Sequence, residues 1–223
     1  MMIQANGELH DAMSIDPLFG FLKEATGFLI VRVLFPIALI SFLGIRATGQ
    51  ATSIDTAHSK LLIRVSKSGV FSGFADNHEV EAQIAQGSLD ATSGEVRLSV
   101  DTRQMKVLDP KLRADKRQQV QERMLGPEVL DSSRFPSITF ESTGVEHRQE
   151  GTVIVEGRLS LHGVTKPIAI RGRVENGRYT GKFELKQRDF DITPISIAGG
   201  TVKVKDELAI EFDITTLSGA KGN

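Results

Sequence analysis

The chain has 223 residues, which is enough for one large domain or two small ones. Its net charge of −1 excludes a broad basic field that would attract nucleic acid or an anionic membrane. The absence of cysteine excludes disulfides, thiolate metal sites, a cysteine nucleophile and a lipid anchor on an N-terminal cysteine.

An apolar segment near the N-terminus has the layout of a secretory signal peptide. Val33–Ile45 is preceded by Arg32 and followed by small residues suited to a cleavage site, Ala47, Gly49 and Ala51. The run is shorter than the roughly 20 residues that a membrane-spanning helix needs. We predict that residues 1–51 are an extension and signal peptide, that the rest is exported, and that only this segment contacts a membrane. An uncleaved inner-membrane anchor is the alternative.

Residues 52–217 are predicted to form one β-domain, and residues 218–223 a frayed tail. Apolar and polar residues alternate with period two almost throughout, which is typical of strands with one buried face. The alternating runs are Leu61–Val65, Val96–Val100, Ile138–Phe140, Val153–Leu161, Ile168–Val174, Phe183–Leu185, Val202–Val204 and Leu208–Ile214. Val80–Leu89 is predicted as a further strand whose facing the pattern does not give.

Glycine-containing pairs between these runs predict tight turns, namely Ser93-Gly94, Asn176-Gly177 and Gly199-Gly200. About eight strands with one dry face must close on themselves or pair with a second sheet. The fold class is therefore all-β, a single antiparallel β-barrel. A barrel of this size has an interior that side chains fill or that holds one small ligand.

One helix is expected in a long connection between strands. Asp109 is predicted as its N-cap and Pro110 as its first residue, Lys111–Leu125 contains good helix formers, and Gly126-Pro127 ends it. Two interpretations are open: a lid over one end of the barrel, or a simple connection.

The polar residues give no strong catalytic or metal-binding motif. The four histidines after the signal segment lack the close spacing of metal ligands, and the densest group of candidate ligands is Asp76-Asn77-His78-Glu79. A solvated loop is the simpler interpretation of that group, and a turn residue is the simpler interpretation of His162. Lys203 and Lys205 share a face that fits either an anionic head group or, more simply, a salt-bridged outer surface. No nucleophile elbow or phosphate-binding loop occurs, so we predict no enzyme.

Three stretches together resemble the YceI-like family of bacterial proteins. They are Ile54–Ser59, the Phe-Pro phrase in Ser133–Ser142, and Gly157–Ile168, which contains Leu-His-Gly-Val-Thr-Lys-Pro. The resemblance runs from about Ser53 to Ile214. Two segments depart from the family's pattern, the Gln- and Arg-rich helix and the Asp76–Glu79 loop.

The resemblance implies a lipocalin-like barrel in the periplasm that binds a long isoprenoid lipid, either a quinone or a polyprenyl phosphate, in place of a cofactor. The apolar strand faces would then line a tunnel, in which a lipid chain gains roughly 0.8 kcal/mol per buried CH₂. Ten residues are predicted to form its wall: Leu98, Val100, Ile138, Phe140, Leu159, Leu161, Ile168, Ile170, Phe183 and Phe212.

Two other functions remain open at this point. The first is a metal-assisted enzyme that uses His78 and Glu79. The second is a stress-related interaction protein whose barrel is solid. The pattern predicts no nucleic-acid partner and makes no prediction of oligomeric state.

Overall fold

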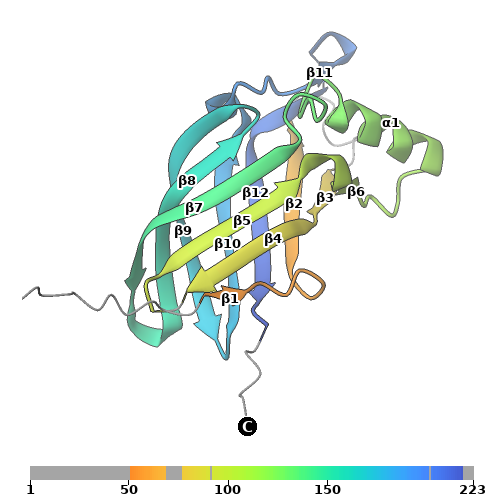
Figure 1. The fold of residues 1–223 in the computed structure, drawn as a ribbon. Coiled ribbons are helices and arrows are strands. Elements are labelled where there is room, and N and C mark those ends of the chain that lie inside the picture. The colour runs from red at the N-terminus through yellow and green to blue at the C-terminus, as the bar shows by residue number, and fades with distance from the viewer. Residues whose placement is uncertain (1–50, 69–76, 91, 201, 218–223) are drawn as a thin grey trace, which may run out of the picture. The chain divides into compact units, whose positions relative to one another are not determined.

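The structure is a computed structural model that describes residues 51–68, 77–90, 92–200 and 202–217. The predicted signal segment, the tail after residue 217 and Asp76 lie outside the described residues. Twelve strands, one α-helix and four short 3₁₀ helices follow one another along this part of the chain (Figure 1). The strands are β1 (Thr52–Ser53), β2 (Lys60–Ser68), β3 (His78–Ala82), β4 (Ile84–Asp90), β5 (Glu95–Asp101), β6 (Lys106–Val107), β7 (Ser137–His147), β8 (Thr152–Leu161), β9 (Val164–Glu175), β10 (Arg178–Lys186), β11 (Ser196–Ile197) and β12 (Val202–Thr215). The helices are α1 (Ala114–Leu125), η2 (Thr102–Gln104), η3 (Gln149–Gly151), η4 (Gln187–Phe190) and η5 (Ala198–Gly200).

All strand pairs are antiparallel, and the sheet curls into a barrel-like shape (Figure 1). The order across it is β1-β4-β5-β7-β8-β9-β10-β12-β2-β3-β6, with β11 paired to β12. The chain itself links the two ends of this strand order, because β3 near one end leads into β4 near the other through Gln83. The segment that contains β1 forms a second link. β1 pairs with β4, and Ile54, which follows β1, forms an isolated bridge with Thr216 after β12. The predicted all-β antiparallel barrel is therefore confirmed.

Two ends of the barrel are distinguished below. The upper end carries α1 and β11 in Figure 1, and the lower end carries β1. The turns at residues 55–59, 92–94, 148–151 and 176–177 lie at the lower end, because each joins the ends of two strands that are near β1.

Alternation along the strands places apolar residues inside and polar residues outside, as predicted. On β8, Val153, Leu159 and Leu161 are buried while Glu156 and Arg158 are exposed. The predicted turn at Asn176-Gly177 is also confirmed, since both residues adopt the left-handed conformation between the paired ends of β9 and β10. His162 takes the same role with Gly163 between β8 and β9, which confirms it as a turn residue.

The expected strand Val80–Leu89 is two strands with different partners. Residues before Gln83 belong to β3 and pair with β2 and β6, whereas residues after it belong to β4 and pair with β1 and β5. One straight strand cannot pair with both sets, so the chain changes direction at Gln83. Val80, Ala82 and Ile84 are buried, which gives the facing that the pattern did not.

The predicted start of the helix is wrong. The helix begins at Ala114 after Arg113, which makes no side-chain cap. Asp109 is buried and accepts a hydrogen bond from the backbone N–H of Glu79 at 2.8 Å, and its carboxylate also bonds the ring of His78. The carboxylate therefore binds residues of β3 and does not cap the helix. Residues 110–112 form a turn instead of the first helical turn.

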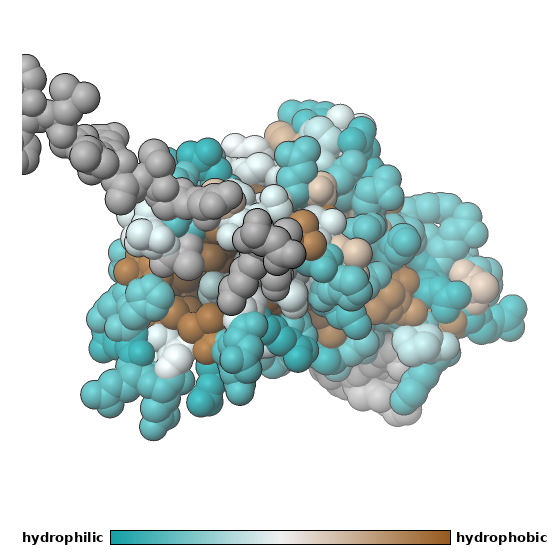
Figure 2. Space-filling view, turned by 60° about the horizontal axis from the view of Figure 1, so that its bottom comes forward, coloured by the Kyte–Doolittle hydropathy of each residue, from teal (hydrophilic) through white to brown (hydrophobic). Residues whose placement is uncertain are grey.

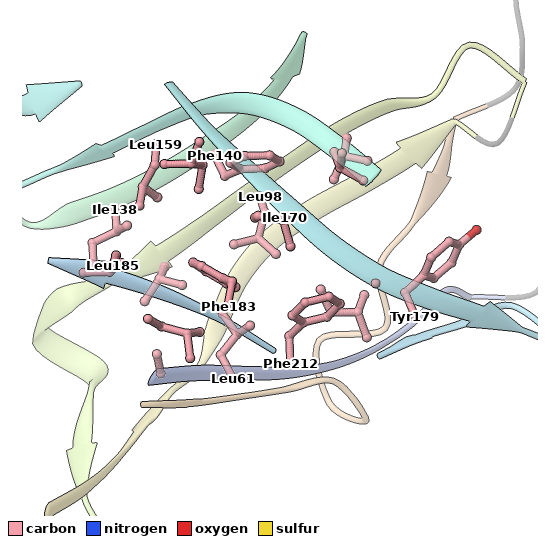
Figure 3. Close-up of a pocket in the computed structure, with 18 of the residues that line it drawn as sticks. Leu61, Leu98, Ile138, Phe140, Leu159, Ile170, Tyr179, Phe183, Leu185 and Phe212 are labelled. Atoms are coloured by element: carbon pink, nitrogen blue, oxygen red, sulfur yellow. The ribbon is translucent and has the colours of Figure 1, made fainter. Parts of the chain in front are cut away.

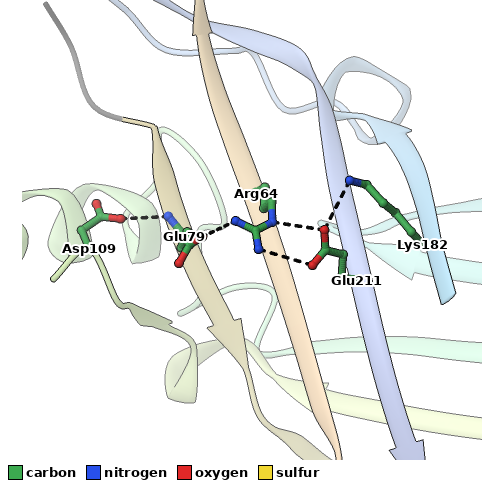
Figure 4. Close-up of polar contacts among 5 residues, drawn as sticks. All are labelled: Arg64, Glu79, Asp109, Lys182 and Glu211. Atoms are coloured by element: carbon green, nitrogen blue, oxygen red, sulfur yellow. Dashed lines mark hydrogen bonds and ion pairs between the residues drawn. The ribbon is translucent and has the colours of Figure 1, made fainter. Parts of the chain in front are cut away.

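A row of ion pairs crosses the outer face over four neighbouring strands (Figure 4). Arg64 on β2 pairs with Glu79 on β3 and with Glu211 on β12, and Lys182 on β10 approaches Glu211 to 3.3 Å. The hydrogen bond and charge attraction between Arg64 and Glu211 raise the pKa of Arg64 and lower that of Glu211. In the part of the chain that the structure describes, no helix is long and apolar enough to cross a membrane.

Candidate functional site

The barrel encloses a cavity of about 470 Å³. Side chains from strands that lie across the barrel from one another point into this cavity. Phe140 and Leu159 come from one side of the barrel, and Leu61 and Phe212 come from the other (Figure 3). Its lining is almost entirely aliphatic and aromatic, and the polar residues at its wall are Asp90, His147, Tyr179 and Gln187. The interior therefore offers space to an apolar molecule and few hydrogen bonds.

All ten residues predicted for the tunnel wall line this cavity. Four of them are buried: Val100, Phe140, Leu159 and Leu161. The other six point inward but are only partly buried: Leu98, Ile138, Ile168, Ile170, Phe183 and Phe212. Inward side chains with exposed surface indicate that the interior is not filled by the protein's own residues. Their contact with a ligand stays a prediction.

Glycines at inward positions help to keep this space open. A methyl group at Gly181 would lie 2.5 Å from Cζ of Phe212, and one at Gly172 would lie 3.1 Å from the same atom. A methyl group at Gly157 on β8 would likewise collide with the ring of Phe140. Because the rings occupy the volume that side chains at these positions would take, they lie close to the sheet and leave the centre free.

Irregular segments close the upper end of the cavity. Met105, Leu130 and Ile192 line it there and are buried, and Phe190 of η4 packs with them in the core. Gln121 of α1 fixes one of these segments, because its side chain accepts from Val107 N–H and donates to Met105 O, each at 2.7 Å. The residues after α1, including Val129 and Leu130, reach the cavity, while α1 contributes no lining residue. The helix therefore anchors a lid segment and is not itself the lid.

The lower end is more open. His147 is exposed, and Tyr179, Val174 and Ile214 are partly buried, although all four line the cavity. Figure 2 turns this end toward the viewer and shows hydrophobic residues in a recess bordered by hydrophilic ones. Burial raises the pKa of the Tyr179 hydroxyl, so this group is a neutral hydrogen-bond donor at the cavity's edge. Asp90 is held differently, since backbone N–H groups of Ser93 and Thr92 donate to it and lower its pKa.

His78 and Glu79 do not form a joint site. They are adjacent on β3, where successive side chains point to opposite faces. Glu79 pairs with Arg64 on the outer face, and the His78 ring bonds Asp109. Among the described residues there is no group of three or more His, Asp and Glu side chains placed to hold a metal ion. Lys203 and Lys205 are exposed, and within the described residues no ion pair is found for either, unlike the salt-bridged surface expected for them.

Sequence analysis missed two kinds of lining residue. Val96, Val155, Leu185 and Ile210 lie on alternating strand faces, so the same period-two signal that gave the ten predicted residues could have found them. Met105, Leu130 and Ile192 come from irregular segments with no periodic pattern, and the local sequence carries no signal that places them over the cavity.

Comparisons with known proteins agree with this architecture. A family model described as a YceI-like domain matches residues 53–216. A UPF0312 protein of Shewanella oneidensis is 24% identical over 184 residues, which are 78% of this chain and 92% of the relative. The crystal structure of Burkholderia cenocepacia BcnA has a TM-score of 0.57 at 16% identity, covering 74% of this chain and 99% of BcnA. A polyisoprenoid binding domain from Saccharophagus degradans, implicated in plant cell wall breakdown, has a TM-score of 0.50 at 16% identity, covering 73% and 95% of the two chains. At such identities the structural likeness establishes the fold alone.

Proposed function

The chain belongs to the YceI-like domain family, and we propose that it is an exported carrier that holds an isoprenoid-type lipid, a quinone or a polyprenyl phosphate, inside its barrel. The bound lipid takes the place of a cofactor, and the protein carries out no chemical reaction on it.

One observation carries this proposal: a cavity of about 470 Å³ with an apolar wall drawn from strands all round the sheet. Its volume falls within the roughly 300–1,000 Å³ that is usual for small-molecule sites. A long hydrocarbon chain would gain roughly 0.8 kcal/mol for each CH₂ that it buries there. The isoprenoid chemistry is supported by the structural neighbour from Saccharophagus degradans, which is itself a polyisoprenoid binding domain.

Two specific observations count against the alternatives. A solid-barrel interaction protein would need a filled interior, and the inward side chains of Phe183 and Phe212 are only partly buried. A metal-assisted enzyme built on His78 and Glu79 would need both side chains on one face, and they point to opposite faces.

Export is supported by the layout of residues 32–51. Cell fractionation followed by N-terminal sequencing tests it. We expect the protein in the periplasm, beginning after a small residue between Ala47 and Ala51. A periplasm-facing protein that retains Val33–Ile45 would identify an uncleaved anchor instead.

The central test is native mass spectrometry of the purified protein, followed by solvent extraction and identification of the released molecule. We expect one isoprenoid chain per protein. A protein that stays empty after incubation with vesicles containing quinones and polyprenyl phosphates would overturn the proposal.

A further inference from the structure

The wall of the barrel has a gap in its hydrogen-bonded pairing between β9 and β10. β9 pairs with β8 along its whole length from Val164 to Arg173, and β10 pairs with β12 from Arg178 to Lys186. The two strands pair with each other only beside their turn, and the last pair is Gly172 with Gly181. Residues 164–171 of β9 and 182–186 of β10 therefore face each other without a ladder. This stretch is called the seam below.

The seam borders the cavity directly. Ile168 and Ile170 on one side and Phe183 and Leu185 on the other line the cavity, and all four are only partly buried. The ring of Phe212 lies behind Gly172 and Gly181 at the lower limit of the seam. Its upper limit is η4, where the backbone oxygen of Phe190 lies 3.2 Å from Nδ1 of His162 in the β8–β9 turn. A strand pair held only at its two limits can separate without breaking any ladder between them.

The outer rim of the seam carries charges of both signs. Arg171 stands on β9, and Lys182, Glu184 and Lys186 stand on β10. Lys182 and Lys186 lie directly opposite Glu211 and Glu207 on β12, so neighbouring carboxylates offset their charges. Lys166 belongs to the inward face of β9, because its cross-strand partner is the buried Leu159.

The lower end is acidic. Its strand ends and turns, in residues 55–60, 90–95, 146–152 and 175–178, carry six carboxylates and three Lys or Arg side chains. An anionic bilayer would repel this end more strongly than it would repel the charge-balanced rim of the seam.

Resting on the proposed function, we infer that the lipid passes from a membrane into the cavity through the seam, between β9 and β10. The sequence predicts membrane contact through the N-terminal segment alone, because strand alternation does not reveal where a sheet lacks a ladder.

A reversible cross-link tests the route, because the chain has no cysteine of its own. Arg171→Cys with Lys182→Cys places two outward-facing thiols across the first unpaired position of the seam. Arg173→Cys with Thr180→Cys is the matched control, since these residues already form a pair in the ladder. Each pair is joined by oxidation or, where the thiols do not oxidise, by a short bismaleimide.

The readout is the rate at which the full chain takes up a fluorescent isoprenoid quinone from phosphatidylglycerol vesicles. Closing the seam should slow uptake by about tenfold or more, as expected for a gated site, and reducing a disulfide should restore it. The control cross-link should leave the rate unchanged. Equal rates for the seam variant and the control would show uptake through the lower end and overturn this inference.

A parent protein that takes up no quinone from any vesicle would contradict the proposed function itself and not the route through the seam.

Discussion

The ring of Phe212 on β12 packs against the backbone of Gly181 on β10, its direct cross-strand partner. A methyl group at Gly181 would meet both Phe212 Cζ, at 2.5 Å, and the backbone oxygen of Arg171, at 2.6 Å. Because the oxygen belongs to the neighbouring strand, it cannot move aside as the end of a flexible side chain can. The glycine is therefore required by close packing across three strands.

Gly181→Ala should lower the free energy of unfolding by about 1–3 kcal/mol, the usual cost of overpacking a well-packed site. Urea denaturation measures it. Gly144→Ala on β7 is the control, because nothing lies within 4 Å of the added methyl group. Equal stability of the two variants would mean that Phe212 and the backbone around residue 181 can shift without strain.

Phe183→Asp should abolish retention of the co-purifying lipid. The carboxylate would stand in an apolar wall, where it has no hydrogen-bond partner and repels a hydrocarbon chain. Native mass spectrometry gives the retained lipid, and circular dichroism verifies the fold. Glu156→Ala on the outer face of β8 should retain the lipid as the parent does. A folded Phe183→Asp protein carrying the same lipid in equal amount would show that the inner face is assigned wrongly.

Gln121→Ala should destabilise the upper end of the barrel. The change removes the partners of Val107 N–H and Met105 O, and leaving a buried polar group unpaired costs about 1–3 kcal/mol. Hydrogen exchange at the Val107 amide should accelerate with the loss of stability. Gln118→Ala is the control on the same helix, since Gln118 donates a hydrogen bond to the exposed Glu122. A Val107 amide that exchanges at the parent's rate would argue against this anchor.

Arg64→Gln should raise the pKa of Glu211 toward its ordinary value of 4.5, because hydrogen bonds from Arg64 are the main cause of its depression. A depressed pKa in the folded state stabilises the protein above the ordinary pKa, and this contribution is lost as pH falls through the folded-state pKa. The stability difference between parent and variant should thus be largest above pH 4.5 and shrink on acidification. NMR titration of the Glu211 carboxyl checks the shift. Arg97→Gln, which removes the pairing with Glu95, should leave that titration unchanged.

Much of the fold and part of the site follow from the sequence alone. Period-two alternation reports which side of a strand is dry, and this local signal identifies Leu98, Phe140, Ile170 and Phe183 as inward residues before any pairing is known. Asn176-Gly177 determines its turn for an equally local reason, because both residues tolerate the left-handed backbone that a two-residue hairpin requires.

Only the tertiary structure decides what depends on distant partners. Asp109 has the sequence context of a helix cap, yet its carboxylate bonds Glu79 and His78 on β3. Met105, Leu130 and Ile192 close the cavity from segments without periodicity. The extent of the seam is also decided by the tertiary structure, since both β9 and β10 continue as strands beyond the point where their ladder ends. The alternation of apolar and polar residues reports only which face of a strand each side chain occupies. Which strands pair, and how the barrel closes, depends on how far the whole sheet curls, and long-range packing determines that curl.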